Sequence, residues 1–137
     1  MSFVLDNSVT MRWAFQQPGS DLTYALKILN RLAHESAVAP SLWPLEVTNV
    51  LAVSERKGFL LAEESQAFIC QLEVLPIEID NTTHQVSFSR ILAMARLYKL
   101  SSYDAAYLEL ASRRKLPLAT LDKELKKAAR NVQVEII

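Results

Sequence analysis

Short apolar runs alternate along the chain with longer segments of helical periodicity, and this alternation limits the fold more than any other feature. Runs that fit buried strands lie at residues 2–6, 37–40, 76–80, 116–121 and 132–137. Segments with a helical pattern separate them, at residues 8–15, 22–35, 41–57, 62–75, 82–99, 100–114 and just after residue 122. Strands separated by helices favour a mainly parallel sheet flanked by helices. We therefore predict one α/β domain over residues 1–137.

Composition excludes several classes of protein. Half of the residues are hydrophobic, which suffices for a buried core, but no apolar run approaches the length of about 18 residues that marks a membrane span. No basic region followed by a long apolar stretch opens the chain, so we expect no signal peptide and a cytoplasmic protein. The single cysteine, Cys70, rules out an internal disulfide and a cysteine-based zinc site, and His34 and His84 are isolated.

The net charge of zero conceals an uneven distribution. Residues 1–89 carry a net charge of −5 and residues 90–137 a net charge of +5. Most of the basic excess comes from Arg113, Arg114, Lys115, Lys123, Lys126, Lys127 and Arg130. Such a cluster can attract a polyanion, but solvated helix faces produce the same pattern, and charge alone favours that simpler interpretation.

One acidic residue falls inside the apolar face of the helix predicted at residues 100–114. At about 100° per residue, Asp104 shares an arc with Tyr103 and Tyr107, whereas Glu109 and Arg113 fall on the opposite side. Burying a lone carboxylate costs several kcal/mol unless another group pairs with it. The position of Asp104 therefore requires an explanation.

Three further acids fit a pocket shared with Asp104. Glu46 falls on the apolar arc of its own helix, and Asn49 lies one turn away from it. Asp6 and Asp122 each end an apolar strand, and parallel strands place such ends at one edge of the sheet, where ligands bind. Taken singly, the acids have simpler explanations: the strand-end acids can cap the following helices, and the helical acids can pair with a buried Arg or Lys. One shared acidic pocket explains all four together.

Four neighbouring carboxylates imply a cation. They repel each other, and their pKa values rise unless a cation is present. Carboxylate oxygens select Mg²⁺ or Mn²⁺ over zinc, and no His/Cys cluster competes for the role. An ion held in this way can activate water and stabilise the charge of a phosphodiester transition state, while the basic half of the chain holds a nucleic-acid backbone.

The segments "VLDNSVTMRWAF", "PLEVTNVL", "SSYDAAYLELA" and "LPLATLDKELKKAAR", in this order, resemble a PIN-domain ribonuclease, and most closely the VapC-type toxins of toxin–antitoxin pairs. The resemblance implies a PIN-like three-layer sandwich with a central, mainly parallel sheet. It also implies an endoribonuclease that depends on Mg²⁺ or Mn²⁺, acts as a toxin, forms a homodimer, is blocked by a VapB-type antitoxin and meets DNA only through that antitoxin. The residues that match the family's metal-binding acids and their polar neighbours are Asp6, Glu46, Asp104 and Asp122, with Ser8 and Thr120 near the metal and Asn49 near the glutamate.

Our mechanistic hypothesis is hydrolysis of an RNA phosphodiester. Asp6 and Asp104 bind the principal Mg²⁺, directly or through water, while Glu46 and Asp122 complete the pocket and one of them orients the attacking water. Arg12 is a candidate phosphate contact, weighed evenly against a plain surface role.

Other interpretations stay open at this point. Within the family, a housekeeping RNA-processing nuclease is an alternative to the toxin, and an RNA-binding or scaffold module without catalysis is a further alternative. A phosphatase or receiver domain that phosphorylates an Asp at a strand end is a different enzyme class, but Ser8 and Lys123 match its motifs poorly. The candidate residues for contact with an antitoxin or a second copy are Trp13, Phe15, Phe59, Leu60 and Leu61, and most of them fit a buried core equally well.

Overall fold

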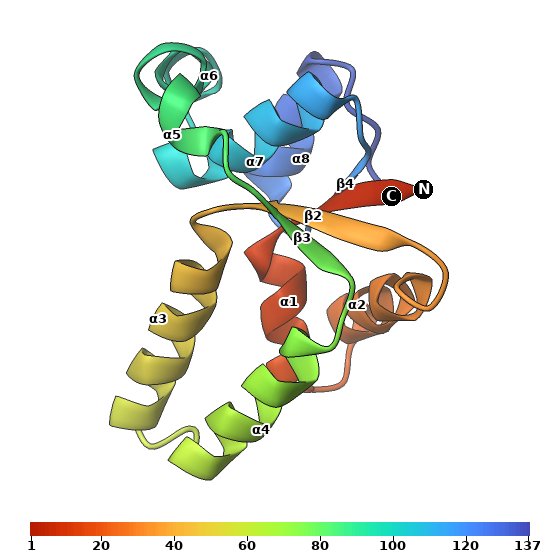
Figure 1. Ribbon diagram of the computed structural model, residues 1–137, viewed down its shortest axis with the longest axis vertical. Helices are drawn as coiled ribbons and strands as arrows, with labels where there is room; N and C mark the ends of the chain where they lie inside the picture. The colour runs from red at the N-terminus through yellow and green to blue at the C-terminus, as the bar shows by residue number, and fades with distance from the viewer.

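Four parallel strands form the central sheet of the computed structural model, which describes residues 1–137 (Figure 1). The strands are β1 (Ser2–Leu5), β2 (Ser36–Pro40), β3 (Ile77–Asp80) and β4 (Leu118–Ala119), in the spatial order β3–β2–β1–β4. Val4 of β1 lies opposite both Val38 and Leu118, so β1 is at the centre of the pairing. Phe3, Val4 and Leu5 are fully buried, as expected for a parallel strand with helices on both faces. The predicted parallel α/β sheet is confirmed.

Helices cover both faces of the sheet and give three layers (Figure 1). One face carries α1 (Asn7–Ala14), α2 (Ser20–Arg31), α3 (Trp43–Arg56) and α4 (Ala62–Glu73). The other carries α5 (Thr83–Val86), the π-helical turn η1 (Ser87–Ile91), α6 (Leu92–Tyr98), α7 (Ser102–Arg114) and α8 (Lys123–Asn131). None of these helices combines the length and the apolarity that a membrane crossing requires.

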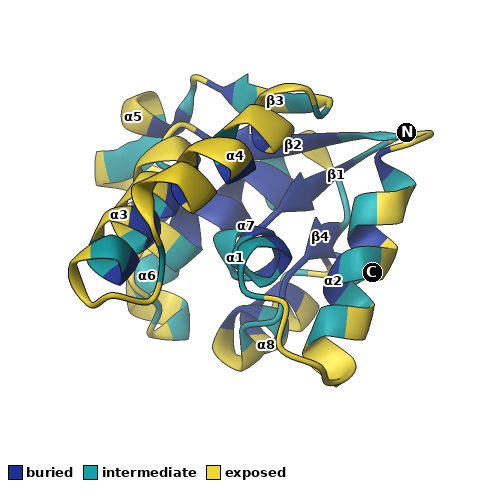
Figure 2. Cartoon of the chain, turned by 90° about the horizontal axis from the view of Figure 1, so that it is seen from below, coloured by how far each residue is buried: buried dark blue, intermediate teal, exposed yellow.

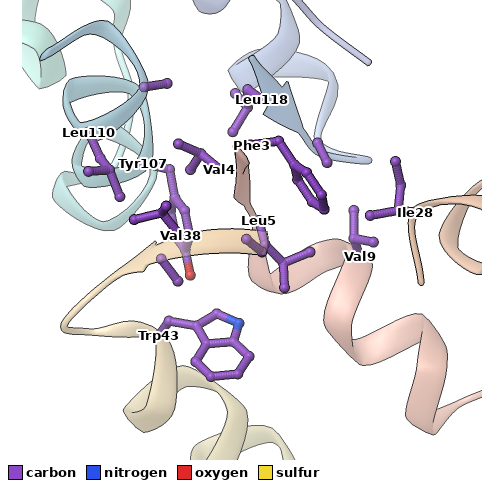
Figure 3. Close-up of a cluster of buried hydrophobic side chains, with 14 of the residues drawn as sticks. Phe3, Val4, Leu5, Val9, Ile28, Val38, Trp43, Tyr107, Leu110 and Leu118 are labelled. Atoms are coloured by element: carbon purple, nitrogen blue, oxygen red, sulfur yellow. The ribbon is translucent and has the colours of Figure 1, made fainter. Parts of the chain in front are cut away.

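The main core lies where the sheet meets the inner faces of the helices. Figure 2 shows β1, β2 and β4 buried over most of their length, whereas the edge strand β3 is only partly buried. The helices are buried toward the sheet and exposed outside. Phe3, Leu5, Val38, Trp43 and Tyr107 belong to one cluster of buried side chains (Figure 3). This packing fixes the ends of the strands relative to the helices that begin there.

Two segments differ from the sequence-based expectation. The helix predicted over residues 82–99 is divided into α5, η1 and α6, because the Ser87 hydroxyl donates to the Thr83 carbonyl (2.7 Å) and such back-bonding distorts helices. The strand predicted at residues 132–137 is reduced to a single bridge between Leu118 and Ile136, since β4 is only two residues long.

The middle of α7 has no solvent-exposed face, contrary to its amphipathic pattern. Glu109, expected on the polar side, is only 1% exposed, and Tyr103, expected to pack inward, is 62% exposed. The helix lies against β1 and β2 and also contacts η1, α6 and α8, so neighbours surround it. The prediction for these two residues is wrong because the amphipathic pattern does not reveal how many elements cover a helix.

Arg113 neutralises the buried Glu109. Its Nε donates to Glu109 Oε1 (2.7 Å) and its Nη2 donates to Asp80 Oδ1 (2.9 Å) at the end of β3. Burial acts to raise the pKa of Asp80, but hydrogen bonds from Arg113 and from the Thr82 N–H, with the charges of Arg113 and Arg114, outweigh it and lower that pKa. One guanidinium thus connects α7 to the edge strand of the sheet.

Replacing Arg113 by Met should destabilise the fold, because Glu109 and Asp80 are left buried with little compensating charge. We expect a loss of about 3 kcal/mol in the free energy of unfolding, measured by urea denaturation. The neighbouring Arg114, whose ion pairs with Glu78 and Asp80 are longer and more exposed, is the matched control. Arg114→Met should cost less than about 1 kcal/mol. Equal losses in the two variants would contradict the role given to Arg113.

Candidate functional site

The four acids that the sequence singles out lie at the N-terminal ends of four helices. Asp6 follows β1 and precedes α1, and Asp122 follows β4 and precedes α8. Glu46 is in the first turn of α3 and Asp104 in the first turn of α7. Because β1 and β4 are parallel neighbours, their following residues lie at the same edge of the sheet. The structure therefore brings segments more than 100 residues apart into one site.

Asp6 is the most deeply buried of the four, with 4% of its surface exposed. Its Oδ2 accepts hydrogen bonds from the hydroxyls of Ser8 (2.5 Å) and Thr120 (2.7 Å). The hydroxyl of Ser8 in turn accepts a hydrogen bond from the Leu121 N–H, and the hydroxyl of Thr120 accepts one from the Asp122 N–H. Burial raises the pKa of Asp6, the hydroxyls oppose that effect, and the charge of Asp122 adds to it. The hydroxyl of Ser8 therefore orients the carboxylate of Asp6.

Glu46 has one hydrogen-bond partner, the hydroxyl of Tyr107, which donates to Oε1 (2.5 Å). Burial raises the pKa of this half-buried glutamate, and the charges of Asp6 and Asp104 raise it further, while the bond from Tyr107 acts in the opposite direction. The sequence placed Tyr107 on the packing face of α7 but contained no signal for its hydroxyl partner.

Asp104 is half-buried and forms no salt bridge, so the basic partner considered for it from the sequence is absent. Burial, followed by the charges of Asp122 and Asp6, raises the pKa of Asp104 to about 6, and a hydrogen bond with Ser101 only partly offsets this. Ser101 is the N-cap of α7, where its Oγ accepts the Asp104 N–H (3.1 Å).

Asp122 combines two roles that the sequence left as alternatives. Its Oδ1 accepts the Leu125 N–H (2.8 Å) and so caps α8. Its charge also raises the pKa values of Asp6 and Asp104, so the carboxylate belongs electrostatically to the same pocket. A capping role and membership of the acidic site are therefore compatible.

Two other candidate residues are not drawn into the acidic pocket by any hydrogen bond. Asn49 is exposed on α3, and no hydrogen bond joins it to Glu46. The guanidinium of Arg12 donates to the backbone carbonyls of Phe15 (2.7 Å) and Gln17 (2.6 Å), where it closes the C-terminal end of α1. These two bonds give Arg12 a structural role at the end of its helix.

The donor set suits a hard divalent cation held in part by water. Carboxylate and hydroxyl oxygens come together at this edge of the sheet, and the acids raise each other's pKa. No lysine or arginine forms a salt bridge with any of the four acids. No three Asp, Glu, His or Cys side chains are arranged to hold one ion together. A hard divalent cation can be bound through only one or two carboxylates while it retains several waters, so this donor set is compatible with such an ion.

A family model described as PIN domain matches residues 3–131. The chain belongs to the PIN domain family. PIN domains are generally nucleases, so the alternative of a phosphatase or receiver domain is wrong. No curated protein matches this PIN domain.

Solved structures share the fold of this PIN domain. VapBC2 from Rickettsia felis, bound to a DNA fragment from their promoter, is similar at a TM-score of 0.69 and 13% identity, over 100% of this chain and 98% of that chain. PAE2754 from Pyrobaculum aerophilum has a TM-score of 0.66 and 21% identity, over 93% and 79%. FitAcB from Neisseria gonorrhoeae has a TM-score of 0.58 and 17% identity, over 100% and 96%. At these identities the likeness establishes the fold.

Asp80 shows how the environment separates a structural acid from a site acid in this PIN domain. It ends β3 just as Asp6 and Asp122 follow β1 and β4, so the sequence signal is the same. Its pKa is lowered by Arg113, whereas the pKa values of Asp6 and Asp104 are raised. Only the tertiary partner distinguishes the two cases.

The raised pKa of Asp104 predicts a dependence of stability on pH. An unfolded Asp has a pKa of about 3.9, so the folded state binds the proton more tightly and the free energy of unfolding falls as the pH rises from about 4 to about 6. Asp104→Asn removes this penalty. Without divalent ions, the variant should be more stable than wild type by about 1 kcal/mol at pH 7, allowing for the half-exposed side chain, and equally stable below pH 4.

Urea denaturation at pH 3.5 and pH 7 measures this difference. Glu73→Gln, which removes an exposed acid at the end of α4, is the control and should show no such pH-dependent gain. An Asp104→Asn variant that is less stable than wild type at pH 7 would contradict the electrostatic description of the pocket.

Proposed function

We propose that the chain is a metal-dependent endoribonuclease that hydrolyses RNA phosphodiester bonds and acts as the toxin of a type II toxin–antitoxin pair. The observation that carries the enzymatic part is the grouping of Asp6, Glu46, Asp104 and Asp122 without any basic partner. Mutual repulsion of the four carboxylates destabilises the fold. A cluster that is kept despite this cost supports a functional role for these acids. Membership of a family whose members are generally nucleases supports the same conclusion.

Asp6 and Asp104 are the residues that we assign to the principal Mg²⁺, or Mn²⁺, directly or through water. Glu46 and Asp122 complete the pocket. When bound, the divalent ion lowers the pKa of a water and stabilises the negative charge that develops on the phosphate. The hydroxyls of Ser8 and Thr120 keep Asp6 oriented, as their hydrogen bonds to Oδ2 indicate.

Glu46 is the acid best suited to orient the attacking water and accept its proton. Its pKa is raised, which brings its basicity nearer to the operating pH of a general base. Asp122 already accepts the Leu125 N–H through Oδ1, so less of its carboxylate is available. Asp6 and Asp104 are assigned to the ion.

The exposed face of α8 is our candidate surface for the RNA backbone. Lys123, Lys127 and Arg130 are exposed on this helix, which begins directly after Asp122. By contrast, Arg113 and Arg114 are engaged in ion pairs, so the basic cluster seen in the sequence is divided by the fold. Binding through phosphate contacts weakens steeply as the salt concentration rises. We therefore expect the affinity of this surface for RNA to fall with added salt.

The toxin assignment and the partners rest on the structural relatives. This chain shares its fold with VapBC2 and FitAcB, and the VapBC2 structure contains a DNA fragment from their promoter. We propose a VapB-type antitoxin as partner, a homodimer of the PIN domain, contact with DNA only through the antitoxin, and action in the cytoplasm. Phe59 and Leu61 are exposed, as a partner surface requires, whereas Trp13 is buried with its Nε1 bonded to the Ala25 carbonyl and is excluded from it.

Asp6→Asn and Asp104→Asn should each abolish RNA cleavage, with a loss of at least about a hundredfold in rate, because each removes a charge needed to hold the ion. Both substitutions keep the side-chain shape, and circular dichroism should show the native helix content. Cleavage of total RNA is followed with and without Mg²⁺, with Glu73→Gln as a control that cleaves normally. Wild-type cleavage by either Asn variant would show that the assignment is wrong.

Toxicity separates a toxin from a housekeeping nuclease. Induced expression of the wild-type chain should arrest growth, whereas expression of Asp6→Asn should not. Co-expression of a small antitoxin frame found directly upstream of its gene should restore growth. RNA cleavage without growth arrest would favour the RNA-processing alternative. Absence of both cleavage and Mn²⁺ binding would favour a scaffold module.

A further inference from the structure

Tyr107 is fully buried, yet its hydroxyl reaches the acidic pocket. It lies one turn after Asp104 on α7, and its ring passes β2 beside Val38 toward the start of α3 (Figure 3). The hydroxyl donates to Glu46 Oε1 (2.5 Å). The backbone N–H of Asn7 also acts on this hydroxyl and opposes the rise in the pKa of Tyr107 that burial causes.

This one hydroxyl connects α7 to α3 and lies near the start of α1, and all three of these elements carry acids of the site. Tyr107 shares α7 with Asp104, Asn7 directly follows Asp6, and Glu46 belongs to α3. No other side chain forms a hydrogen bond with Glu46. The N–H of Asn7 is one of the groups at the start of α1 that the helix itself leaves unpaired. Tyr107 therefore fixes the carboxylate of Glu46, a residue of another helix, close to the start of α1.

We propose that Tyr107 is a positioning residue, which holds Glu46 at a fixed place relative to Asp6 and Asp104 and so prepares the pocket for a divalent ion. This inference rests on the proposed function. A free glutamate side chain samples many rotamers, and ordering it costs free energy that binding of the ion would otherwise have to supply. A buried donor on a rigid helix removes that cost in advance, because the ring of Tyr107 is locked by packing in the core.

The ring and the hydroxyl have separable roles. The ring fills space in the core, which phenylalanine does equally well, whereas only the hydroxyl reaches Glu46. Tyr107→Phe should therefore keep the helix content. We expect about a tenfold loss in Mn²⁺ affinity by calorimetry and about a tenfold fall in kcat, with little change in the KM for RNA, because the backbone-binding surface is untouched.

A double-mutant cycle tests whether Tyr107 acts through Glu46. Glu46→Gln keeps the shape but removes the charge, and Tyr107→Phe added to it should cause no further loss of Mn²⁺ affinity. Mn²⁺ binding, together with the rise in Tm on adding Mn²⁺, is measured in all four proteins, so the result does not depend on residual activity. Tyr103→Phe is the matched control, since it removes an exposed hydroxyl from the same helix and should bind Mn²⁺ as wild type does.

Two results would overturn the inference: wild-type Mn²⁺ affinity in Tyr107→Phe, or losses for Tyr107→Phe and Glu46→Gln that simply add. If Tyr107→Phe does not fold, Glu46→Asp tests the same contact, because it keeps the charge but withdraws the carboxylate from the hydroxyl. About a tenfold lower Mn²⁺ affinity in Glu46→Asp supports the contact, and wild-type affinity overturns it.

The proposed function and this inference fail in different ways. Unchanged Mn²⁺ binding in Asp6→Asn would contradict the proposed metal site itself. If Asp6→Asn loses Mn²⁺ binding but Tyr107→Phe retains it, the metal site stands and only the positioning role of Tyr107 is wrong.

Discussion

Repulsion between four carboxylates at one edge of a parallel sheet is the constraint on which the arrangement of this protein depends. A helix follows each strand of the parallel sheet. Therefore α1, α3 and α8 begin at the edge of the sheet where β1, β2 and β4 end. With the first turn of α7, these helix starts carry Asp6, Glu46, Asp122 and Asp104. The positive end of each helix dipole favours a nearby carboxylate, which offsets part of the repulsion.

The chain deals with buried acids in two opposite ways. Asp80 and Glu109 receive the guanidinium of Arg113, and this contact ties α7 to β3. The acids of the pocket receive only hydroxyl groups and backbone N–H groups, which orient a carboxylate without neutralising it. The first arrangement supports the fold, and the second keeps negative charge available for a cation. The difference between a structural acid and a site acid therefore lies in the partner.

Sequence reasoning succeeded where a property is periodic and local. The strand–helix alternation predicted the parallel sheet, and the positions of Glu46 and Asp104 in apolar arcs predicted that both point inward. It failed where several elements meet. Glu109 is buried because α7 is covered on all sides in its middle. The hydroxyl contacts of Ser8, Thr120 and Tyr107 depend on atoms up to 114 residues away.

The sequence by itself determined the alternation of elements, the parallel sheet and the set of acids that had no local explanation, because these follow from hydrophobic periodicity and from the cost of burying a lone charge. Only the tertiary structure decided which acids have no basic side chain beside them and which are neutralised by one, since Asp6, Asp80 and Asp122 carry the same local signal at strand ends. It also decided that the phenol of Tyr107 is a hydrogen-bond donor to Glu46, because that contact joins α7 to α3 across the end of the sheet.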